Sequence, residues 1–232
     1  MIIDDRNSML NWYPKIKDLA IMQPETNIVP IQWMPAHQGI RNFPQVYKAA
    51  RQIGFPLFMR TDHFSGKHSW NRTCYVDKLH NLEANLLNLV EESEMAGMLG
   101  LPVNAIVFRK YVEMESAFIA FGGLPVSKER RYFVKDGRVK CHHAYWIEPA
   151  IEFWGATRAE EPPDWREKLQ ALNYESDVEI DLLTTYAQQV SQVLSGYWSV
   201  DFCLSKSKMW YLIDCATGEQ SWHPPCQYAK EL

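Results

Sequence analysis

Apolar residues recur at helical spacing in several stretches of this chain and gather in short runs between them. The helical spacing predicts helices over residues 11–20, 43–53, 77–98 and 176–194. The short apolar runs predict strands over residues 27–32, 56–60, 104–108, 116–122, 130–135, 138–145, 200–204 and 209–214. Asp136-Gly137, between two of these strands, is typical of a two-residue hairpin turn. Antiparallel strands interrupted by helices predict an α+β fold with two lobes more than a regular doubly wound sheet.

The last predicted hairpin contains one acidic residue in each apolar strand. Asp201 lies in the first strand and Asp214 at the end of the second, around the polar turn 205–208. Carboxylates avoid buried strands unless a partner compensates their charge. Two of them on neighbouring strands therefore indicate a divalent-cation site.

Composition limits the class of protein. The 232 residues include 47% hydrophobic and 13% aromatic residues, enough for one large domain or two small lobes that share a core. A net charge of −4 argues against a basic coat for nucleic acid or membranes, although a local basic groove stays open. No apolar run is long enough to cross a bilayer, and the first residues lack the segments of a leader peptide. We therefore expect no membrane partner, and nucleic acid is disfavoured without being excluded.

Cysteine usage favours a reducing compartment. The five cysteines are an odd number without paired spacing, so neither a disulfide framework nor a CxxC zinc site is indicated. We expect the protein in the cytoplasm.

Neither of two histidine-containing clusters supports a zinc site. Neighbouring residues of Cys141-His142-His143 lie on opposite faces of a strand, so the three cannot converge on one ion. His223-Pro224-Pro225-Cys226 lacks a second half. The nine tryptophans are expected in the core, with a cleft for a peptide or bases as the alternative.

Two common nucleotide-binding motifs are absent. The chain has neither a GxGxxG sequence that opens a helix nor a GxxxxGK[ST] loop. Lys135-Asp136-Gly137 lacks the spacer of the lysine motif of covalent nucleotidyltransferases, and we interpret it as a turn.

The order of four other features resembles the ATP-grasp superfamily. A strand ending at Arg60 is followed by Ser65-Gly66-Lys67, by a strand running into Arg109-Lys110-Tyr111-Val112, and by the acidic hairpin. That third feature and Glu129-Arg130-Arg131-Tyr132-Phe133-Val134 resemble the "LRK…EFRxFV" pattern of the cell-division-cycle/initiation-factor assembly chaperone branch. The chain is also similar to the small clade marked by one arginine and two lysines. The resemblance covers residues 43–218.

The resemblance implies a nucleotide cleft between antiparallel sheets of two lobes. Residues 56–113 would form the first lobe and residues 114–232 the second, with the metal-site hairpin. Residues 1–55 would form a small N-terminal cap or half-domain.

For ATP, the resemblance implies phosphate contacts from Arg60 and from Lys67 in a loop over the phosphates. It implies that Arg109-Lys110-Tyr111-Val112 is a hinge whose backbone binds the adenine edge, with Glu115, or else Glu113, accepting the ribose hydroxyls. From the residues alone, solvated loop charges are the favoured interpretation of Arg60 and Lys67, and only the other motifs shift it. The alternative for the glutamates is an ordinary charged turn.

For catalysis and metal binding, the resemblance implies that Arg131 points toward the γ-phosphate or an acyl-phosphate, since a guanidinium binds phosphate oxygens bidentately. Alternation places Arg130 on the opposite face. The alternative for Arg131 is an exposed strand arginine paired with Glu129 or Asp136.

Asp201 and Asp214 match the acids that hold Mg²⁺ against the phosphates. The family usually has asparagine where this chain has Ala216, so Thr217, Glu219 or water would replace that contact. The alternative is a pair of strand-end carboxylates neutralised by Arg60, Arg131 or a lysine.

The function implied is that of an ATP- and magnesium-dependent ligase, in which a small-molecule or peptide carboxylate becomes an acyl-phosphate that an amine attacks. The alternative is an ATP-binding assembly factor that clasps a protein partner with little catalysis. A modifier of proteins or nucleic acids encoded by a mobile element stays open. The sequence does not identify the carboxylate or the amine.

Overall fold

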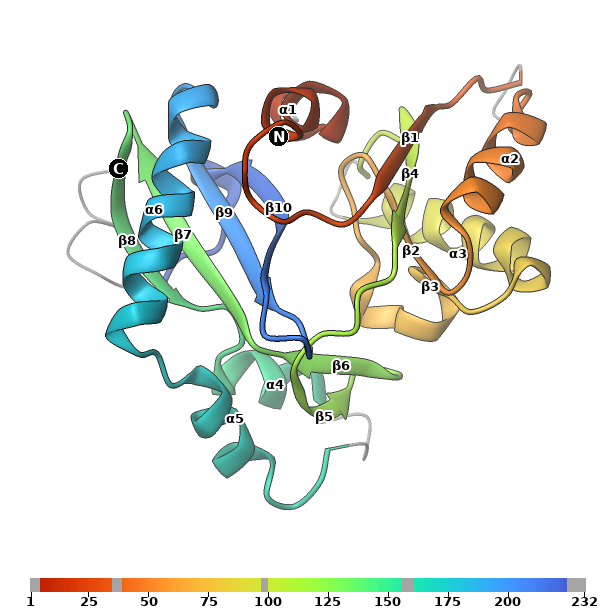
Figure 1. Cartoon of the computed structure of the whole chain (residues 1–232). Helices are drawn as coiled ribbons and strands as arrows, with labels where there is room; N and C mark the ends of the chain where they lie inside the picture. The colour runs from red at the N-terminus through yellow and green to blue at the C-terminus, as the bar shows by residue number, and fades with distance from the viewer. Residues whose placement is uncertain (1–4, 35–38, 97–99, 156–160, 225–232) are drawn as a thin grey trace.

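Two antiparallel sheets form the two halves of the molecule (Figure 1). The computed structural model describes residues 5–34, 39–96, 100–155 and 161–224. The first sheet has the strand order β1-β4-β2-β3, with bounds Thr26–Pro30, Ala105–Lys110, Leu57–Thr61 and Tyr75–Val76. The second has the order β10-β9-β7-β8, with bounds Trp210–Thr217, Tyr197–Leu204, Glu129–Lys135 and Arg138–Ala144. The α+β prediction is confirmed.

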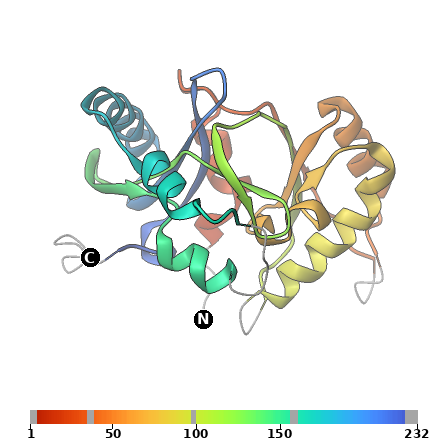
Figure 2. The ribbon, with the colours of Figure 1, turned by 90° about the horizontal axis from the view of Figure 1, so that it is seen from below.

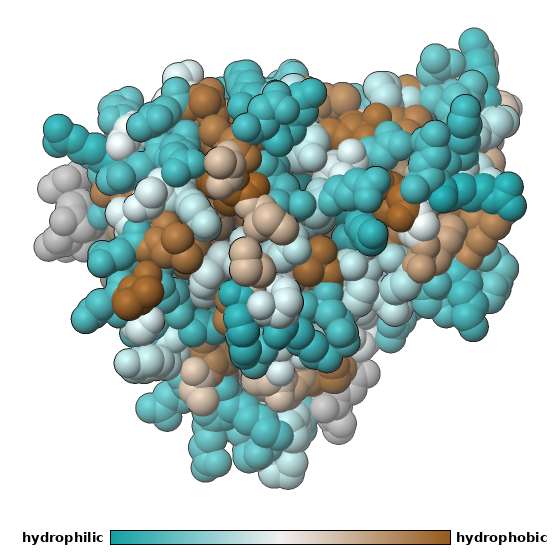
Figure 3. Space-filling view, in the orientation of Figure 1, coloured by the Kyte–Doolittle hydropathy of each residue, from teal (hydrophilic) through white to brown (hydrophobic). Residues whose placement is uncertain are grey.

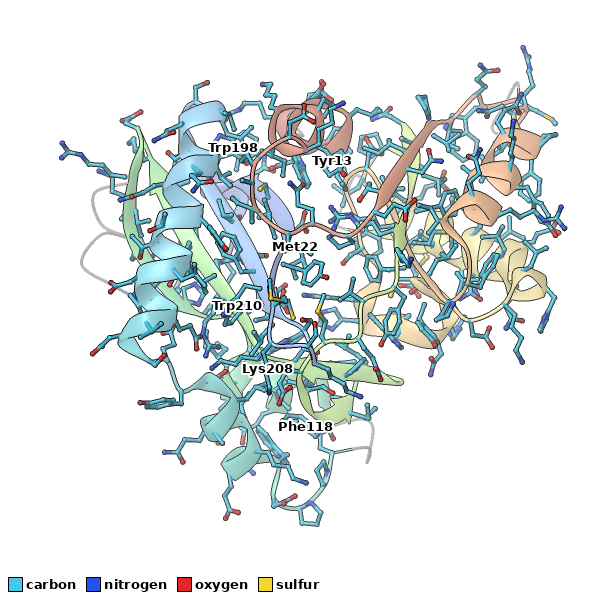
Figure 4. All side chains as sticks on the ribbon, in the orientation of Figure 1. Tyr13, Met22, Phe118, Trp198, Lys208 and Trp210 are labelled. Atoms are coloured by element: carbon cyan, nitrogen blue, oxygen red, sulfur yellow. The ribbon has the colours of Figure 1, made fainter. Side chains whose placement is uncertain are left out.

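Helices cover one face of each sheet. The first sheet packs on α2 (Phe43–Ile53) and α3 (Leu82–Met95) through a buried apolar cluster. The second packs on α6 (Asp177–Val193), and α1 (Met9–Ile16) joins the same cluster, which includes Trp198 and Trp210 (Figure 4). Because side chains alternate along a strand, the other face of each sheet is left for a cleft.

A smaller third unit lies below the two halves (Figures 1 and 2). It contains the β5–β6 hairpin (Ser116–Ala120 and Leu124–Ser127) and the helices α4 (Glu148–Gly155) and α5 (Trp165–Asn173). Phe118, Leu124, Trp146 and Leu169 are buried in its core. Short 3-10 turns complete the described elements: η1 Asp5–Asn7, η3 Lys67–Arg72, η4 Leu79–Asn81 and η5 Gly218–Gln220.

Local sequence signals account for several element boundaries. Pro44 lies in the first turn of α2, directly after the first helical residue Phe43, and Gly54, at φ 83°, ends the helix. The hydroxyl of Ser176 accepts from the amide of Glu179 and caps α6. Asp136 and Gly137 have φ values of 52° and 75°, which confirms the predicted hairpin turn. The helix predicted over 77–98 is observed only as α3, Leu82–Met95, because the 3-10 turn η4 takes up the residues just before it.

The division of the chain near residues 55 and 113 stays a prediction. Within residues 1–55, α1 packs with the core of the second sheet, whereas β1 is the edge strand of the first sheet and α2 covers it. The amide of Leu212 donates to the carbonyl of Met22 (2.9 Å), so the connection between α1 and β1 passes along β10. No described helix combines the length and apolar character needed to span a bilayer.

Candidate functional site

A cleft of about 930 Å³, counting its open mouth, lies between the two sheets. Eight residues predicted for the site line it: Arg60, Lys67, Arg109, Lys110, Tyr111, Val112, Asp201 and Asp214. The face shown in Figure 3 is largely hydrophilic, with apolar groups scattered over it.

A β-bulge brings the two aspartates together. The β9–β10 pairing keeps a regular register from Trp210↔Leu204 to Leu212↔Phe202, and then shifts so that Asp214 lies opposite Asp201. Without the shift, Asp214 would face Val200 on the opposite side of the sheet. The extra residue, Ile213, therefore places both carboxylates on the cleft face.

Each aspartate is paired with an arginine. Asp214 Oδ2 lies 2.8 Å from Arg60 Nη1, and Arg131 donates two hydrogen bonds to Asp201, at 2.8 and 2.7 Å. Burial alone would raise the pKa of Asp214, but Arg60 and Arg109 outweigh it and hold that pKa below its ordinary value. Without a ligand the carboxylates are thus neutralised as the sequence alternative described, and the metal role stays a prediction. Within the described ranges, no three His, Cys, Asp or Glu side chains form a ready metal group.

Arg109 is a buried cation with an unused donor. It is 5% exposed, and its Nη1 donates to the carbonyl of Ile213. Burial, together with the neighbouring charge of Arg60, lowers the pKa of Arg109 to about 10. Among the described residues, its Nε has no hydrogen-bond partner, and the same holds for Nε1 of Trp146, which also lines the cleft. An unpaired buried donor is costly, and neither nitrogen is itself exposed to the cleft.

Lys67 is held by two aromatic rings and a glutamate. Its Nζ lies 3.8 Å from the ring centroid of Tyr145, 4.8 Å from that of Trp146, and 3.4 Å from Glu129 Oε1. Although burial opposes the charge, Glu129 and Tyr145 keep the pKa of Lys67 above its ordinary value. The preceding Gly66 is left-handed at φ 61°, and a Cβ there would lie 2.9 Å from Leu89. The loop thus aims a fixed cation into the cleft.

Glu129 belongs to the sequence pattern at residues 129–134, but that pattern does not predict it as a site residue. It is 6% exposed and lines the cleft. Burial, with a smaller contribution from the nearby Asp201, raises the pKa of Glu129 to about 7 against the opposing charge of Lys67. Tyr145 and Trp146 were missed as cation partners, because their role depends on tertiary packing.

The hinge end of the cleft is more apolar. Tyr111 meets Tyr75 edge-on at 5.1 Å, and Tyr75 stacks on Trp70 at 5.7 Å. Met114, Leu124 and Cys203 also line this end. A flat heterocycle could pack here between the strand faces.

The two hinge glutamates lie away from the cleft lining. Glu115 pairs with Lys208 at 2.8 Å, and Glu113 pairs with Lys206 at 2.7 Å. The two lysines belong to the β9–β10 turn. Figure 4 places Lys208 at the tip of this hairpin. Neither glutamate belongs to the residues that line the cleft, and the ribose role stays a prediction.

Arg131 lies at the edge of the cleft rather than among its lining residues. It contacts the cleft through Asp201 and through the ring of Tyr145, 4.6 Å from its guanidinium carbon. Arg130 points to the other face, where its Nε lies 2.9 Å from Glu179 Oε1 of α6. Alternation along β7 thus assigns a core role to Arg130 and leaves Arg131 for the cleft.

The missing asparagine has no direct replacement on β10. Ala216 follows Asp214 by two positions and so lies on the cleft face, whereas alternation directs Thr217 away from it. Glu219 is exposed in η5. Among the described acids, Glu129 remains as a third oxygen donor lining the cleft.

Comparisons with known proteins agree with this geometry. The matching family model is that of the ATP-grasp domain, family 3 of the clade marked by one arginine and two lysines, and it covers residues 35–232. No curated protein matches the sequence.

Solved structures match the fold at low sequence identity. C-terminally truncated Cdc123 from Schizosaccharomyces pombe has a TM-score of 0.57 at 11% identity, covering 94% of this chain and 87% of that chain. D-alanine–D-alanine ligase from Bacillus anthracis complexed with ATP has a TM-score of 0.51 at 13% identity, covering 91% of this chain and 53% of that chain. N5-carboxyaminoimidazole ribonucleotide synthetase from Thermotoga maritima has a TM-score of 0.50 at 11% identity, covering 90% of this chain and 41% of that chain. The match thus spans about half or less of the length of these two proteins.

Proposed function

Because the chain belongs to the ATP-grasp domain family, in family 3 of the one-arginine, two-lysine clade, we propose that its cleft binds ATP with magnesium and activates a carboxylate for attack by an amine. The observation that carries the proposal is the set of cationic side chains, Arg60, Lys67, Arg109 and Lys110, that line one cleft between the two sheets. The cleft is lined by four cationic and three acidic residues, although the whole chain has a net charge of −4. A polyanion accompanied by a cation suits this balance.

Each part of the nucleotide has a candidate region. Tyr111, Val112 and the apolar hinge end would hold the adenine. Arg60, Lys67 and Arg109 would hold the phosphates through charge-assisted hydrogen bonds. Asp201, Asp214 and Glu129 would hold magnesium, which takes oxygen ligands and usually keeps phosphate oxygens and waters among them. The ion would neutralise charge on the phosphates when it is bound.

The reaction needs no nucleophile from the protein. An oxygen of the substrate carboxylate attacks the γ-phosphorus of ATP, the bond to ADP breaks, and an acyl-phosphate forms. The amine would then attack the acyl carbon, phosphate would leave with the bonding electrons, and the proton lost from the amine nitrogen would pass to the departing phosphate or to water. Arg131 would stabilise charge on the transferred group, and the closed cleft walls would orient both reactants.

A second candidate is an ATP-binding assembly factor with little turnover. Two observations favour it: the similarity to Cdc123 covers 87% of that chain, and Ala216 leaves the cleft face of β10 without the usual third metal contact.

Release of ADP and phosphate from Mg·ATP, measured with pools of carboxylates and amines, tests the ligase proposal. We expect turnover with one pair, lost in Arg131→Met and kept in the exposed control Lys206→Ala. Tight ATP binding without turnover in any pool, together with a co-purifying protein, would contradict the ligase and favour the assembly factor.

A further inference from the structure

One cysteine and two histidines gather on the second sheet outside the cleft lining. Cys141 lies opposite Phe133 and His143 opposite Arg131 in the β7–β8 pairing. Residues two apart on a strand share a face, so Cys141 and His143 point to the same side. Of the run Cys141-His142-His143, only His142 points to the opposite face of β8, where its ring stacks on that of Tyr132 at 4.8 Å between centroids on the α6 side.

The segment after η5 adds a second histidine to this face. Cys141 Sγ lies 2.7 Å from His223 Nε2. The rings of His143 and His223 are 6.0 Å apart between centroids. Phe133 lies 4.3 Å from His223, and Trp222 meets His143 edge-on at 5.5 Å, so aromatic rings flank the group.

Both histidines present the same nitrogen in the form that binds a metal. Nδ1 of His143 lies 2.7 Å from the carbonyl of Ala144, and Nδ1 of His223 lies 2.6 Å from the carbonyl of Pro224. A carbonyl only accepts hydrogen bonds, so each Nδ1 carries a proton, and in the neutral imidazole Nε2 then has the lone pair. A hydrogen bond from Nδ1 to a carbonyl is the usual support of a metal-binding histidine.

His143 also has an unused acceptor. Its Nε2 is buried and has no hydrogen-bond partner within the part of the chain that the structure describes. A buried lone pair without a donor has lost its water and gained nothing in return. A bound cation would satisfy it.

We propose that Cys141, His143 and His223 bind one zinc ion. Thiolate and imidazole are the ligands that zinc prefers, whereas magnesium and calcium take oxygen. Zinc bonds of about 2.3 Å to sulfur and about 2.0 Å to nitrogen separate the two ligand atoms by about 3.5 Å in a tetrahedron. The 2.7 Å contact between Cys141 and His223 would therefore open by roughly 1 Å on loading.

The described side chains do not form a ready group of three, so loading requires the two imidazoles to move toward Cys141. The three described ligands define the site tested below.

The ion would fasten the C-terminal segment beside the candidate catalytic arginine. Arg131 Nη1 donates to the carbonyl of Trp222 at 3.4 Å, and His143 is the β8 neighbour of Arg131. Zinc would thus act as a structural clip that supports this side of the cleft, independently of whether the cleft catalyses a reaction.

Zinc content per chain and competition with a chromophoric chelator test the proposal on the full-length protein. We expect one zinc per wild-type chain. Zinc affinity should be weaker by about tenfold or more in Cys141→Ser and in His143→Gln, because loss of a residue that merely hydrogen-bonds to a metal ligand already lowers metal affinity by about that factor. His142→Gln, on the same strand but the opposite face, should keep the wild-type affinity.

Cobalt substitution of the wild type gives a second readout that does not depend on the folding of a variant. We expect the visible absorption of tetrahedral cobalt together with a thiolate charge-transfer band. A wild type that binds neither zinc nor cobalt, or equal zinc affinity in Cys141→Ser and the wild type, would overturn the proposal. Absence of metal with fast alkylation of Cys141 would also overturn it and indicate a hydrogen-bonded thiol–imidazole pair.

Discussion

Glu129 provides a pH-dependent signature of the cleft. Its pKa in the folded protein is about 7, above the ordinary value of 4.5 that we expect in the unfolded chain. The protonated carboxyl therefore contributes stability that is complete below pH 4.5 and is lost as the pH rises through 7. Glu129→Gln removes this titration while it keeps the shape of the side chain.

The size of the effect follows from linkage. Between pH 5 and 8, the free energy of unfolding of the wild type should fall by about 2–3 kcal/mol relative to Glu129→Gln, at about 1.4 kcal/mol for each unit of pKa difference. For a chain of this length, that difference corresponds to roughly 5–10 °C in Tm. In the wild type, Lys67 stays protonated across this range, since Glu129 and Tyr145 hold its pKa above the ordinary value against burial.

Urea unfolding at several pH values, followed by tryptophan fluorescence, measures the difference directly. Glu113→Gln is the matched control, because Glu113 is exposed and pairs with Lys206 at the surface. We expect the free energy of unfolding of Glu113→Gln to differ from that of the wild type by the same amount at every pH. A wild type and Glu129→Gln that keep a constant difference from pH 5 to 8 would refute the idea that a buried carboxyl titrates in the cleft.

Three further variants test separate parts of the account. Arg109→Met should weaken ATP binding by about 10–100-fold in calorimetry, because a charged hydrogen bond to phosphate is lost, and unchanged affinity would contradict a phosphate role for this arginine. Glu115→Gln should leave ATP affinity as in the wild type if the Lys208 pair outside the cleft lining is the main role of Glu115, whereas a marked loss would support the predicted ribose role. Lys206→Ala should change the free energy of unfolding by no more than about 1 kcal/mol in urea, because exposed ion pairs contribute little, and a larger loss would show a structural role for the turn.

Much of the fold follows from local sequence patterns. The helix over 43–53, the Asp136-Gly137 turn and the final hairpin each follow from periodicity or turn chemistry, and the structure has them. The opposite directions of Arg130 and Arg131 follow from strand alternation.

Other features could not be derived locally. Asp201 and Asp214 fall on one face only because of the bulge at Ile213, and a regular register would have separated them. The clamp on Lys67 joins η3 to residues that follow β8, so it depends on tertiary packing. The histidines that surround Cys141 come together only when the segment after η5 lies against β8.

Calorimetric titration of ATP with and without magnesium tests the central claim most directly. We predict magnesium-dependent binding to the wild type that weakens by about tenfold or more in Lys67→Met and in Asp214→Asn, on the scale of one charged hydrogen bond. Asp181→Asn, an exposed position on α6, should bind as the wild type does. No binding to the wild type at millimolar ATP, or equal binding by all four proteins, would contradict the assignment of this cleft as a nucleotide site.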